Sequence, residues 1–519
     1  MASNQSAGTT GRHRVITRRA LLGGSAGAAA LVVAYATFGD QLQSGSDGSS
    51  DITGAGAAQA LPDATDAFET ESVRISHLLR RTGFGVTREE FDRYQTMGLE
   101  ETTREIVHYE SVNDDGAIAE AEALANRSDN PGSAAAWWLT RILQTRRPLQ
   151  EKMTLFWHGL LTSQLSVVRD PAAMIAQNEL LRANAMGVFP DLLKAISTDP
   201  AMMVYLDIAG STKESPNENY ARELMELFSM GEGQYSETDV REAARAFTGW
   251  RVPRQRNDQG FPTLLEPLFQ ARGFDDGIKT FLGHSGNFGP NDIIDIIIEQ
   301  PASAAYITGR LFSFFVYADP GEAELQPFID VYLASGYSIG ATVEAMLRSD
   351  VFYSPRAYRA NVKSPLEYAV GATKGLGLQS SAAAFLGGAG RRRGGVLSDM
   401  GQIPMEPPNV AGWPGGVSWL NSATLFARLN YIDLLAGGGA GNERSDQPQT
   451  DPSGQVTGEL GTAAQALDYY LPLLLDDNVS DEAREVLLEY VGDRDALLTA
   501  EQLRGLVYII LASPQYQLA

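Results

Sequence analysis

The chain has 519 residues, of which 44% are hydrophobic and 20% charged, and this composition is typical of a large soluble globular body. The chain has no cysteine, which excludes disulfides, iron–sulfur clusters, thiolate zinc sites and cysteine nucleophiles. Its formal charge is −23, and the first 36 residues hold four arginines and no carboxylate, so the rest carries −27. Such a charge disfavours nucleic acid as a partner, and we interpret the one dense basic run, 391–393, as a solvated turn.

The N-terminal segment has the order of an export signal. Arg18 and Arg19 follow a polar residue and precede a weakly hydrophobic Gly/Ala/Val run that ends near Phe38. This arrangement resembles a twin-arginine signal peptide, and Ala34-Tyr35-Ala36 offers a cleavage site that sets the signal at 1–36. The resemblance implies transient binding to the twin-arginine translocase and a final location in the periplasm, the cell envelope or outside the cell. An uncleaved membrane anchor remains the alternative.

Behind the signal, residues 37–70 are rich in Gly, Ser, Ala and Asp and are predicted to form a flexible linker. Residues 71–519 are predicted to form a mainly α, large multi-helix globular body with at most one small β-hairpin, near 274–283. Within this body, the polar stretch 437–461 is predicted to be a mobile loop.

Helix signals recur along the body. Thr87 and Glu90 form a capping-box pattern ahead of a helix that Gly98 ends, and Ser236 and Asp239 repeat the pattern. Further helices are predicted over 137–147, 152–164, 177–185, 291–317, 325–335, 340–348 and 364–375, and three more close the chain.

The clearest predicted helix begins at Ser215 as the cap, with Glu218 bonding back to it, and ends at Gly231. Its polar face carries Glu218, Arg222 and Glu226 at four-residue spacing. Helix capping would account for Glu218, and ion pairing would account for Arg222. Glu223 lies near the edge of the apolar stripe, so exposure to solvent explains its presence least well. Three carboxylates and a guanidinium on one helix would also suit acid–base chemistry on a carbohydrate.

Several segments together are recognisable. They are HLLRRTGFG at 77–85, KMTLFWH at 152–158, PNENYARELMELF at 216–228, DVREAARAFTGW at 239–250, KTFLG at 279–283, VKSP at 362–365, PPNVAGWPGG at 407–416 and WLN at 419–421. Their order and spacing resemble the bacterial domain-of-unknown-function 1800 family. The resemblance implies a mostly helical exported protein and brings no established activity. Phe274 and Leu160 stand where the family often has histidine, which weakens any metal site built on those positions.

Two histidines and one loop remain as candidate sites. His158 follows two aromatic residues on an apolar helix, and with Glu179 on a neighbouring helix it could bind a metal or transfer a proton. His77 is a second candidate metal ligand. For both histidines the ordinary reading is a core residue. The loop with Asn409, Trp413 and Trp419 offers flat aromatic faces to a sugar or a partner, although we favour a role as a plug between helices.

These observations leave two functional hypotheses, and no cofactor can be named. The first is an exported hydrolase acting on an envelope or extracellular polymer, with Glu218, Arg222, Glu223 and His158 near one cleft. The second is a non-catalytic binding or assembly protein that uses the tryptophan loop and its acidic surface to hold a co-exported partner.

Overall fold

The computed structural model describes residues 67–125, 132–256, 262–378, 380–387, 395–436 and 461–519. The signal at 1–36, most of the linker, the basic run 391–393 and nearly all of the loop 437–461 lie outside these residues. The last linker residues do belong to the body, because Ala67 and Phe68 are buried. No helix in the described part of the chain is both long and apolar enough to cross a bilayer.

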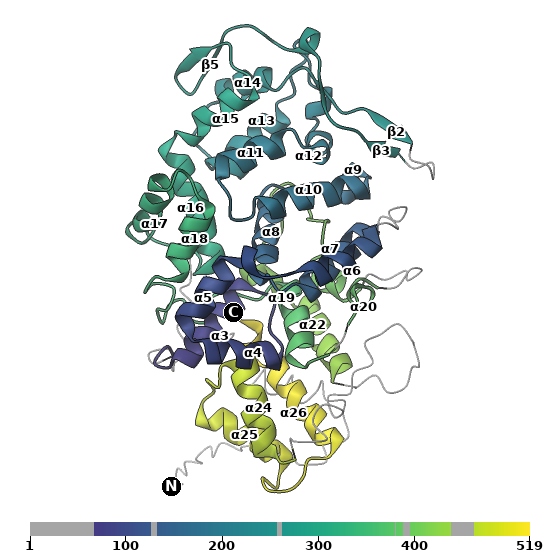
Figure 1. Cartoon of the computed structure of the whole chain (residues 1–519), viewed down its shortest axis with the longest axis vertical. Helices are drawn as coiled ribbons and strands as arrows, with labels where there is room; N and C mark the ends of the chain where they lie inside the picture. The colour runs from purple at the N-terminus through teal and green to yellow at the C-terminus, as the bar shows by residue number, and fades with distance from the viewer. Residues whose placement is uncertain (1–66, 126–131, 257–261, 379, 388–394, 437–460) are drawn as a thin grey trace, which may run out of the picture.

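The body is mainly α and elongated, with helices stacked along its length (Figure 1). The helices are α3 (Glu71–Thr82), α4 (Arg88–Met97), α5 (Leu99–Val107), α6 (Asp115–Ala125), α7 (Gly132–Gln144), α8 (Pro148–Leu160), α9 (Leu165–Val168), α10 (Pro171–Ala183), α11 (Phe189–Ser197), α12 (Pro200–Tyr205), α13 (Asn219–Glu223), α14 (Glu237–Ala246), α15 (Pro290–Ile298), α16 (Pro301–Phe315), α17 (Glu322–Ala334), α18 (Ile339–Leu347), α19 (Pro365–Gly375), α20 (Ala382–Leu386), α21 (Val396–Met400), α22 (Ser422–Leu435), α24 (Ala463–Leu475), α25 (Asp481–Val491) and α26 (Ala500–Ala512). The π-helical turn η4 (Leu224–Ser229) directly continues α13.

Strands are short and pair in twos. The predicted hairpin exists as β5 (Lys279–Phe281) with β6 (His284–Gly286). The expectation of at most one hairpin was too low, because β1 (Trp250–Arg251) pairs with β4 (Leu268–Phe269), and β2 (Arg254–Arg256) with β3 (Pro262–Leu264). All three pairs are antiparallel, and β2 and β3 project from the upper part of the body (Figure 1). Strands of only two or three residues are too short for an alternating pattern to be recognised in the sequence.

Local capping explains where many helices start. Thr87 and Ser236 make the predicted capping boxes of α4 and α14. Proline residues begin helices where the sequence suggested breaks: Pro148 starts α8 and Pro171 starts α10, because the first helical position has no hydrogen bond to lose. Pro301 divides the expected helix 291–317 into α15 and α16 for the same reason.

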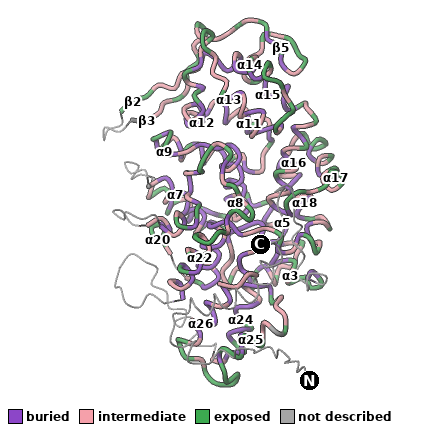
Figure 2. Tube along the Cα trace, turned by 180° about the vertical axis from the view of Figure 1, so that it is seen from behind, coloured by how far each residue is buried: buried purple, intermediate pink, exposed green. Residues whose placement is uncertain are grey.

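The interior consists of two hydrophobic clusters, and buried segments run through the whole length of the body (Figure 2). The first is built largely from α3–α5, α8 and α10–α18, the second largely from α7, α19 and α22–α26. Helix α8 contributes to both clusters, since Trp157 belongs to the first cluster and Leu155 belongs to the second. This position between two cores explains why α8 is buried along nearly its whole length, including the charged residues Glu151 and Lys152.

Candidate functional site

The candidate site lies on the turn where α13 becomes π-helical. Leu224 and Phe228 are fully buried, which fixes this turn against the first cluster and leaves Glu223 and Glu226 half-buried on the opposite side. The amide of Met230 donates to the carbonyl of Met225 at 2.9 Å, the five-residue spacing of a π-helix. Such wide turns are rare in proteins and occur frequently at functional sites.

Glu223 is the unusual carboxylate of the turn. Among the described residues it makes no hydrogen bond and no ion pair, although it is half-buried. Burial, followed by the negative charge of Glu226, raises the pKa of Glu223, and the nearby Arg222 opposes this only in part. A carboxyl group with a raised pKa keeps its proton over a wider pH range, which a general acid requires.

Two tyrosines adjoin Glu226. The Tyr235 hydroxyl donates to Glu226 Oε2 at 2.6 Å, and burial together with that carboxylate raises the pKa of Tyr235. Tyr306 donates to the carbonyl of Leu227 at 2.6 Å, and burial followed by the charge of Glu226 raises its pKa too. Glu226 is therefore held as a hydrogen-bonded carboxylate beside the unpaired Glu223.

Next to this turn lies an open hollow of ≈ 520 Å³. It is lined by Met230, Gln234, Pro301, Ala302, Ala305 and Tyr306. The hollow is shallow and open to solvent, and its lining is mostly apolar with few polar groups. Tyr306 connects the hollow to Glu226, because its side chain lines the hollow and the charge of Glu226 helps to raise its pKa.

On its other side, Glu223 adjoins residues from distant parts of the chain. Burial, then the charges of Glu223 and Glu406, raise the pKa of Tyr205, so both carboxylates lie close to this phenol. Glu406 Oε2 accepts a hydrogen bond from the Ser166 hydroxyl at 2.9 Å. The sequence reasoning missed Tyr205, Tyr235, Tyr306 and Glu406 as site residues, because no local pattern relates them to α13.

Glu218 and Arg222, by contrast, form ordinary surface contacts. Arg222 pairs with Glu237 through two bonds of 2.7 and 2.9 Å and with Glu218 at 3.4 Å. The expected capping box from Ser215 was wrong, since Glu218 itself occupies the N-cap position of α13 without a side-chain bond to the helix. Ser215 instead bridges to Thr212 in a preceding turn, which removes it from the helix. The ion pairs match the structural explanation expected for Arg222, whereas Glu218 is an ion-pair partner and not the capping residue that was expected.

His158 lies away from these carboxylates, inside the body. It is 1% exposed on α8, with ring centroids 5.1 Å from Trp138 and 5.7 Å from Trp413. Neither ring nitrogen has a hydrogen-bond partner, and burial lowers the pKa of His158 to about 4. No described hydrogen bond or ion pair joins it to Glu223 or Glu226. The structure thus does not bring His158 into one cleft with the carboxylates of α13.

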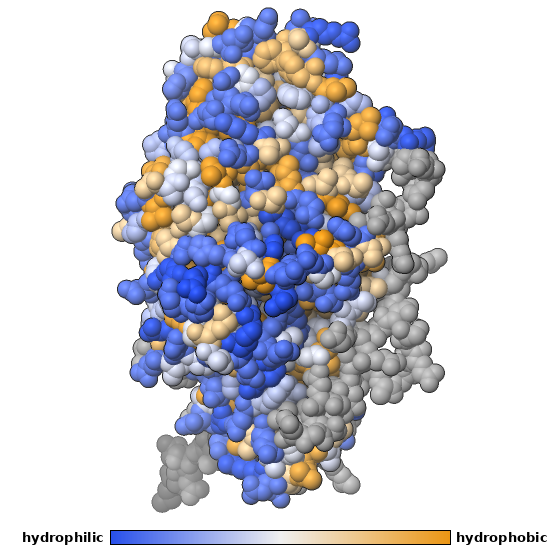
Figure 3. All heavy atoms as spheres, in the orientation of Figure 1, coloured by the Kyte–Doolittle hydropathy of each residue, from blue (hydrophilic) through white to orange (hydrophobic). Residues whose placement is uncertain are grey.

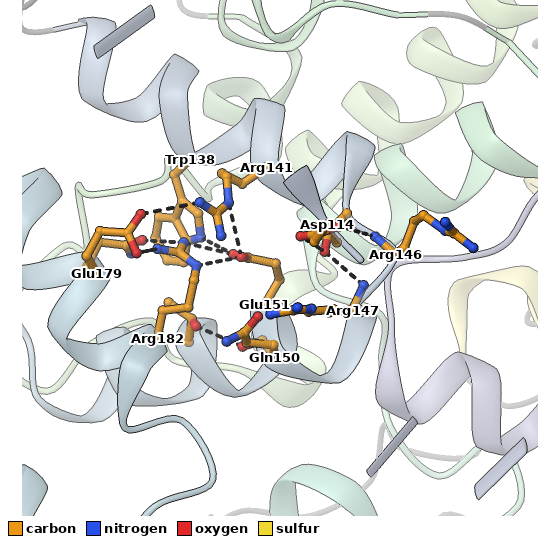
Figure 4. Close-up of polar contacts among 12 residues, drawn as sticks. Asp114, Trp138, Arg141, Arg146, Arg147, Gln150, Glu151, Glu179 and Arg182 are labelled. Atoms are coloured by element: carbon orange, nitrogen blue, oxygen red, sulfur yellow. Dashed lines mark hydrogen bonds and ion pairs between the residues drawn. The ribbon is translucent and has the colours of Figure 1, made fainter. Parts of the chain in front are cut away.

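Glu179 also has other partners. It pairs with Arg141 at 3.4 Å and with Arg182 at 3.1 Å, as part of a charged network centred on the buried Glu151 (Figure 4). Glu151 accepts bonds of 2.6 and 3.0 Å from Arg182 and one of 3.0 Å from the Trp138 indole. Arg182 and Arg141 lower the pKa of Glu151 against the opposing effect of burial. Glu179 therefore extends an ion-pair network rather than a histidine site.

His77 is enclosed by aromatic rings. Its ring centroid lies 5.0 Å from that of Phe68 and 4.6 Å from that of Phe352. Burial, followed by the charges of Arg81 and Arg80, lowers the pKa of His77 well below its ordinary value. Within the described residues no group of three or more His, Asp or Glu side chains is placed to hold a metal ion, so neither histidine belongs to such a group.

The tryptophan loop packs inward. Gly412, at φ +80°, contacts α8 so closely that a Cβ there would lie 2.0 Å from the carbonyl oxygen of Gly159. Trp413 is half-buried against α8, and Trp419 is 6% exposed. Asn409 is exposed, and its side-chain oxygen accepts the amide of Ala411 in a local turn. This packing agrees with the plug between helices favoured from the sequence.

The surface around the upper helices combines apolar and polar residues. In the view of Figure 3, apolar side chains of the described residues form small groups, and most of them lie over the upper half. The middle and lower parts of that face are mainly hydrophilic.

Comparison with known proteins supplies a family. The chain matches no curated protein and no solved structure. It does match one family over residues 77–518, which includes the α13 turn, the buried histidines and the tryptophan loop. That family is described as protein of unknown function, and this chain therefore belongs to the DUF1800 family.

Proposed function

We propose that this chain is an exported hydrolase that acts on a polymer of the cell envelope or the extracellular space, with Glu223 as its proton-transferring group. One observation carries the proposal: Glu223 is a half-buried carboxyl group with a raised pKa and no partner, beside the hydrogen-bonded carboxylate Glu226. Structural carboxylates in this chain, such as Glu151 and Glu218, have ion-pair partners.

The two carboxylates differ in a way that suits hydrolysis. Glu223, whose pKa is raised by burial and by Glu226, gives its proton to the oxygen of the leaving group as the bond to that oxygen breaks. Glu226, oriented by Tyr235, takes a proton from the water whose oxygen forms the new bond. Environments that separate the pKa values of two neighbouring carboxyl groups are the usual basis for such a division of roles. The hollow lined by Tyr306 would receive one unit of the polymer.

The proposed compartment rests on the sequence. Arg18 and Arg19 with the apolar run behind them support export by the twin-arginine route, and a cysteine-free body can fold before export without oxidation. The binding-protein hypothesis has less support, because Trp413 and Trp419 pack against the body and present little surface to a partner.

The activity is tested by screening the purified full-length chain against cell-wall glycans, extracellular polysaccharides and chromogenic glycosides, with release of reducing ends as the readout. On any substrate that is cleaved, Glu223→Gln should lower kcat by about 100-fold or more, the usual contribution of a general acid. It should also remove the loss of activity at high pH, because that loss would report deprotonation of Glu223.

The matched control is Glu218→Gln. It makes the same substitution at the N-cap of α13, and it breaks only the surface pair with Arg222. This variant should keep the activity and pH profile of the wild type. If Glu223→Gln retains full activity on a substrate that the wild type cleaves, Glu223 has no catalytic role.

Export is tested separately with a reporter fused behind residues 1–36. The reporter should reach the periplasm in cells that have the twin-arginine transporter and remain inside when Arg18 and Arg19 are both replaced by lysine. Retention of the unchanged fusion inside such cells would contradict the proposed compartment.

A further inference from the structure

A second feature, distinct from the α13 turn, is a small cavity between α3, α19 and α24. It has a volume of ≈ 40 Å³, and its charged lining residues are Arg80, Lys363, Glu367 and Asp476. Gly85 and Gly371 form part of its wall in direct backbone contact, since a Cβ on Gly85 would lie 2.4 Å from Gly371 Cα. A cavity of this size exceeds the roughly 10–15 Å³ needed for one water and has room for a small ion.

Two carboxylates at the cavity are already engaged by cations. Arg80 pairs with Asp476, and the buried Lys152 pairs with Glu367. Arg359 lies 3.9 Å from Asp476 and also donates to the carbonyl of Leu475 at 2.8 Å.

Lys363 has no such partner. It is 7% exposed and lines the cavity, yet its ammonium group makes no hydrogen bond or ion pair with any described residue. Its Nζ lies 3.6 Å from the centroid of the Tyr516 ring, which is a cation–π contact. Arg80 adds two buried donors without a partner, Nε and Nη2. Unpartnered donors of two cationic side chains therefore lie at the same cavity.

The charges around the cavity do not balance. Basic side chains outnumber acidic ones here: Arg80 and Lys363 line the cavity, and Arg81, Lys152 and Arg359 lie close to it, against the carboxyl groups of Glu367 and Asp476. Burial lowers the pKa of Lys363 well below its ordinary value, so a bound anion would stabilise its ammonium form. Arg81 donates to the carbonyl of Ala357, while its Nε and Nη1 have no partner. Unpaired buried charges destabilise a fold strongly, and an anion bound among them would remove that cost.

We propose that this cavity binds a small oxyanion, held by the Lys363 ammonium and the free donors of Arg80. Inorganic phosphate, sulfate and a small carboxylate share the required chemistry, which is negative oxygen acceptors of compact size. The site contains residues from two segments that carry the family resemblance, 77–85 and 362–365. Neither segment contributes a residue to the proposed hydrolase site. The ligand completes the charge balance at the junction of α3, α19 and α24.

The test is isothermal titration of the full-length chain with phosphate, sulfate and acetate, each at constant ionic strength with sodium chloride as the reference salt. At least one oxyanion should bind saturably at one site per chain. Lys363→Met should weaken that binding at least tenfold, whereas Lys374→Met, on α19 directly after Lys363 but outside the cavity lining, should leave it unchanged.

Crystals soaked in selenate provide a measurement that needs no variant, and an anomalous peak is expected beside Lys363 Nζ. The proposal is overturned if no oxyanion binds saturably, if Lys363→Met binds as tightly as the wild type, or if selenate occupies other positions and leaves the cavity empty. Should Lys363→Met fail to fold, Lys363→Arg replaces it, and this charge-preserving variant should bind within a few-fold of the wild type.

Discussion

His158 should make the stability of the protein depend on pH. Its imidazole is buried between Trp138 and Trp413, and its pKa is lowered from 6.5 to about 4. Between these values the unfolded chain binds a proton that the folded chain does not, so the free energy of unfolding falls as the pH falls from about 6.5 to about 4. A difference of 2.5 units at about 1.36 kcal/mol each gives a loss of about 3 kcal/mol.

His158→Leu removes this titration at a similar side-chain volume and breaks no hydrogen bond of the imidazole. The measurement is urea unfolding of the wild type and the variant between pH 4 and 7. The variant should gain about 3 kcal/mol relative to the wild type on going from pH 7 to pH 4. Contributions of His77, which is also buried, occur in both proteins and cancel in the difference. His284→Gln, at an exposed position on β6, is the control and should follow the wild type.

Parallel stability curves for the wild type and His158→Leu would refute this reasoning, because they would mean that the folded protein protonates His158 as readily as the unfolded chain does.

Three further predictions concern stability and can be checked by urea or thermal unfolding. Glu151→Gln should cost about 3 kcal/mol, because it leaves the buried guanidinium of Arg182 with only the partly exposed carboxylate of Glu179; an unchanged midpoint would show that the network is not stabilising. Gly412→Ala should destabilise the protein and free the tryptophan loop from α8, visible as a shift in tryptophan fluorescence, because its Cβ would collide with the carbonyl of Gly159. Ser236→Ala should cost about 1 kcal/mol through loss of the α14 cap, and a cost near zero would mean that solvent replaces the cap fully.

Much of the helical fold could be predicted because its signals are local. The caps at Thr87 and Ser236 depend on residues three positions apart, and both occur. The Ser215 cap failed for a tertiary reason, since a preceding turn that bridges Thr212 and Ser215 competes for the same backbone. A local sequence pattern does not show whether the turn or the helix cap is the more stable structure at Ser215.

The candidate site was predictable only in part. Glu223 stood out because the apolar stripe and the ion pairs of α13 left it unexplained, and that reasoning needs one helix only. Tyr205 lies close both to Glu223 and to Glu406, which comes from far later in the chain, so no spacing in the sequence could indicate these residues. His158 failed as a partner of Glu223 because its helix lies between the two hydrophobic cores, a position set by the packing of the whole body.

The contact between α3 and α24 has a consequence for the order of folding. Arg80 and Asp476 are 396 residues apart in the chain, and Arg88 reaches the carbonyl of Tyr469 over a similar separation. Closing so large a loop is entropically costly and slow, and it must wait until the C-terminal helices have been synthesised. Helix α3 therefore packs first against α4, α5 and α8, and a nascent chain that has passed α22 still lacks the ion pair of Arg80 with Asp476.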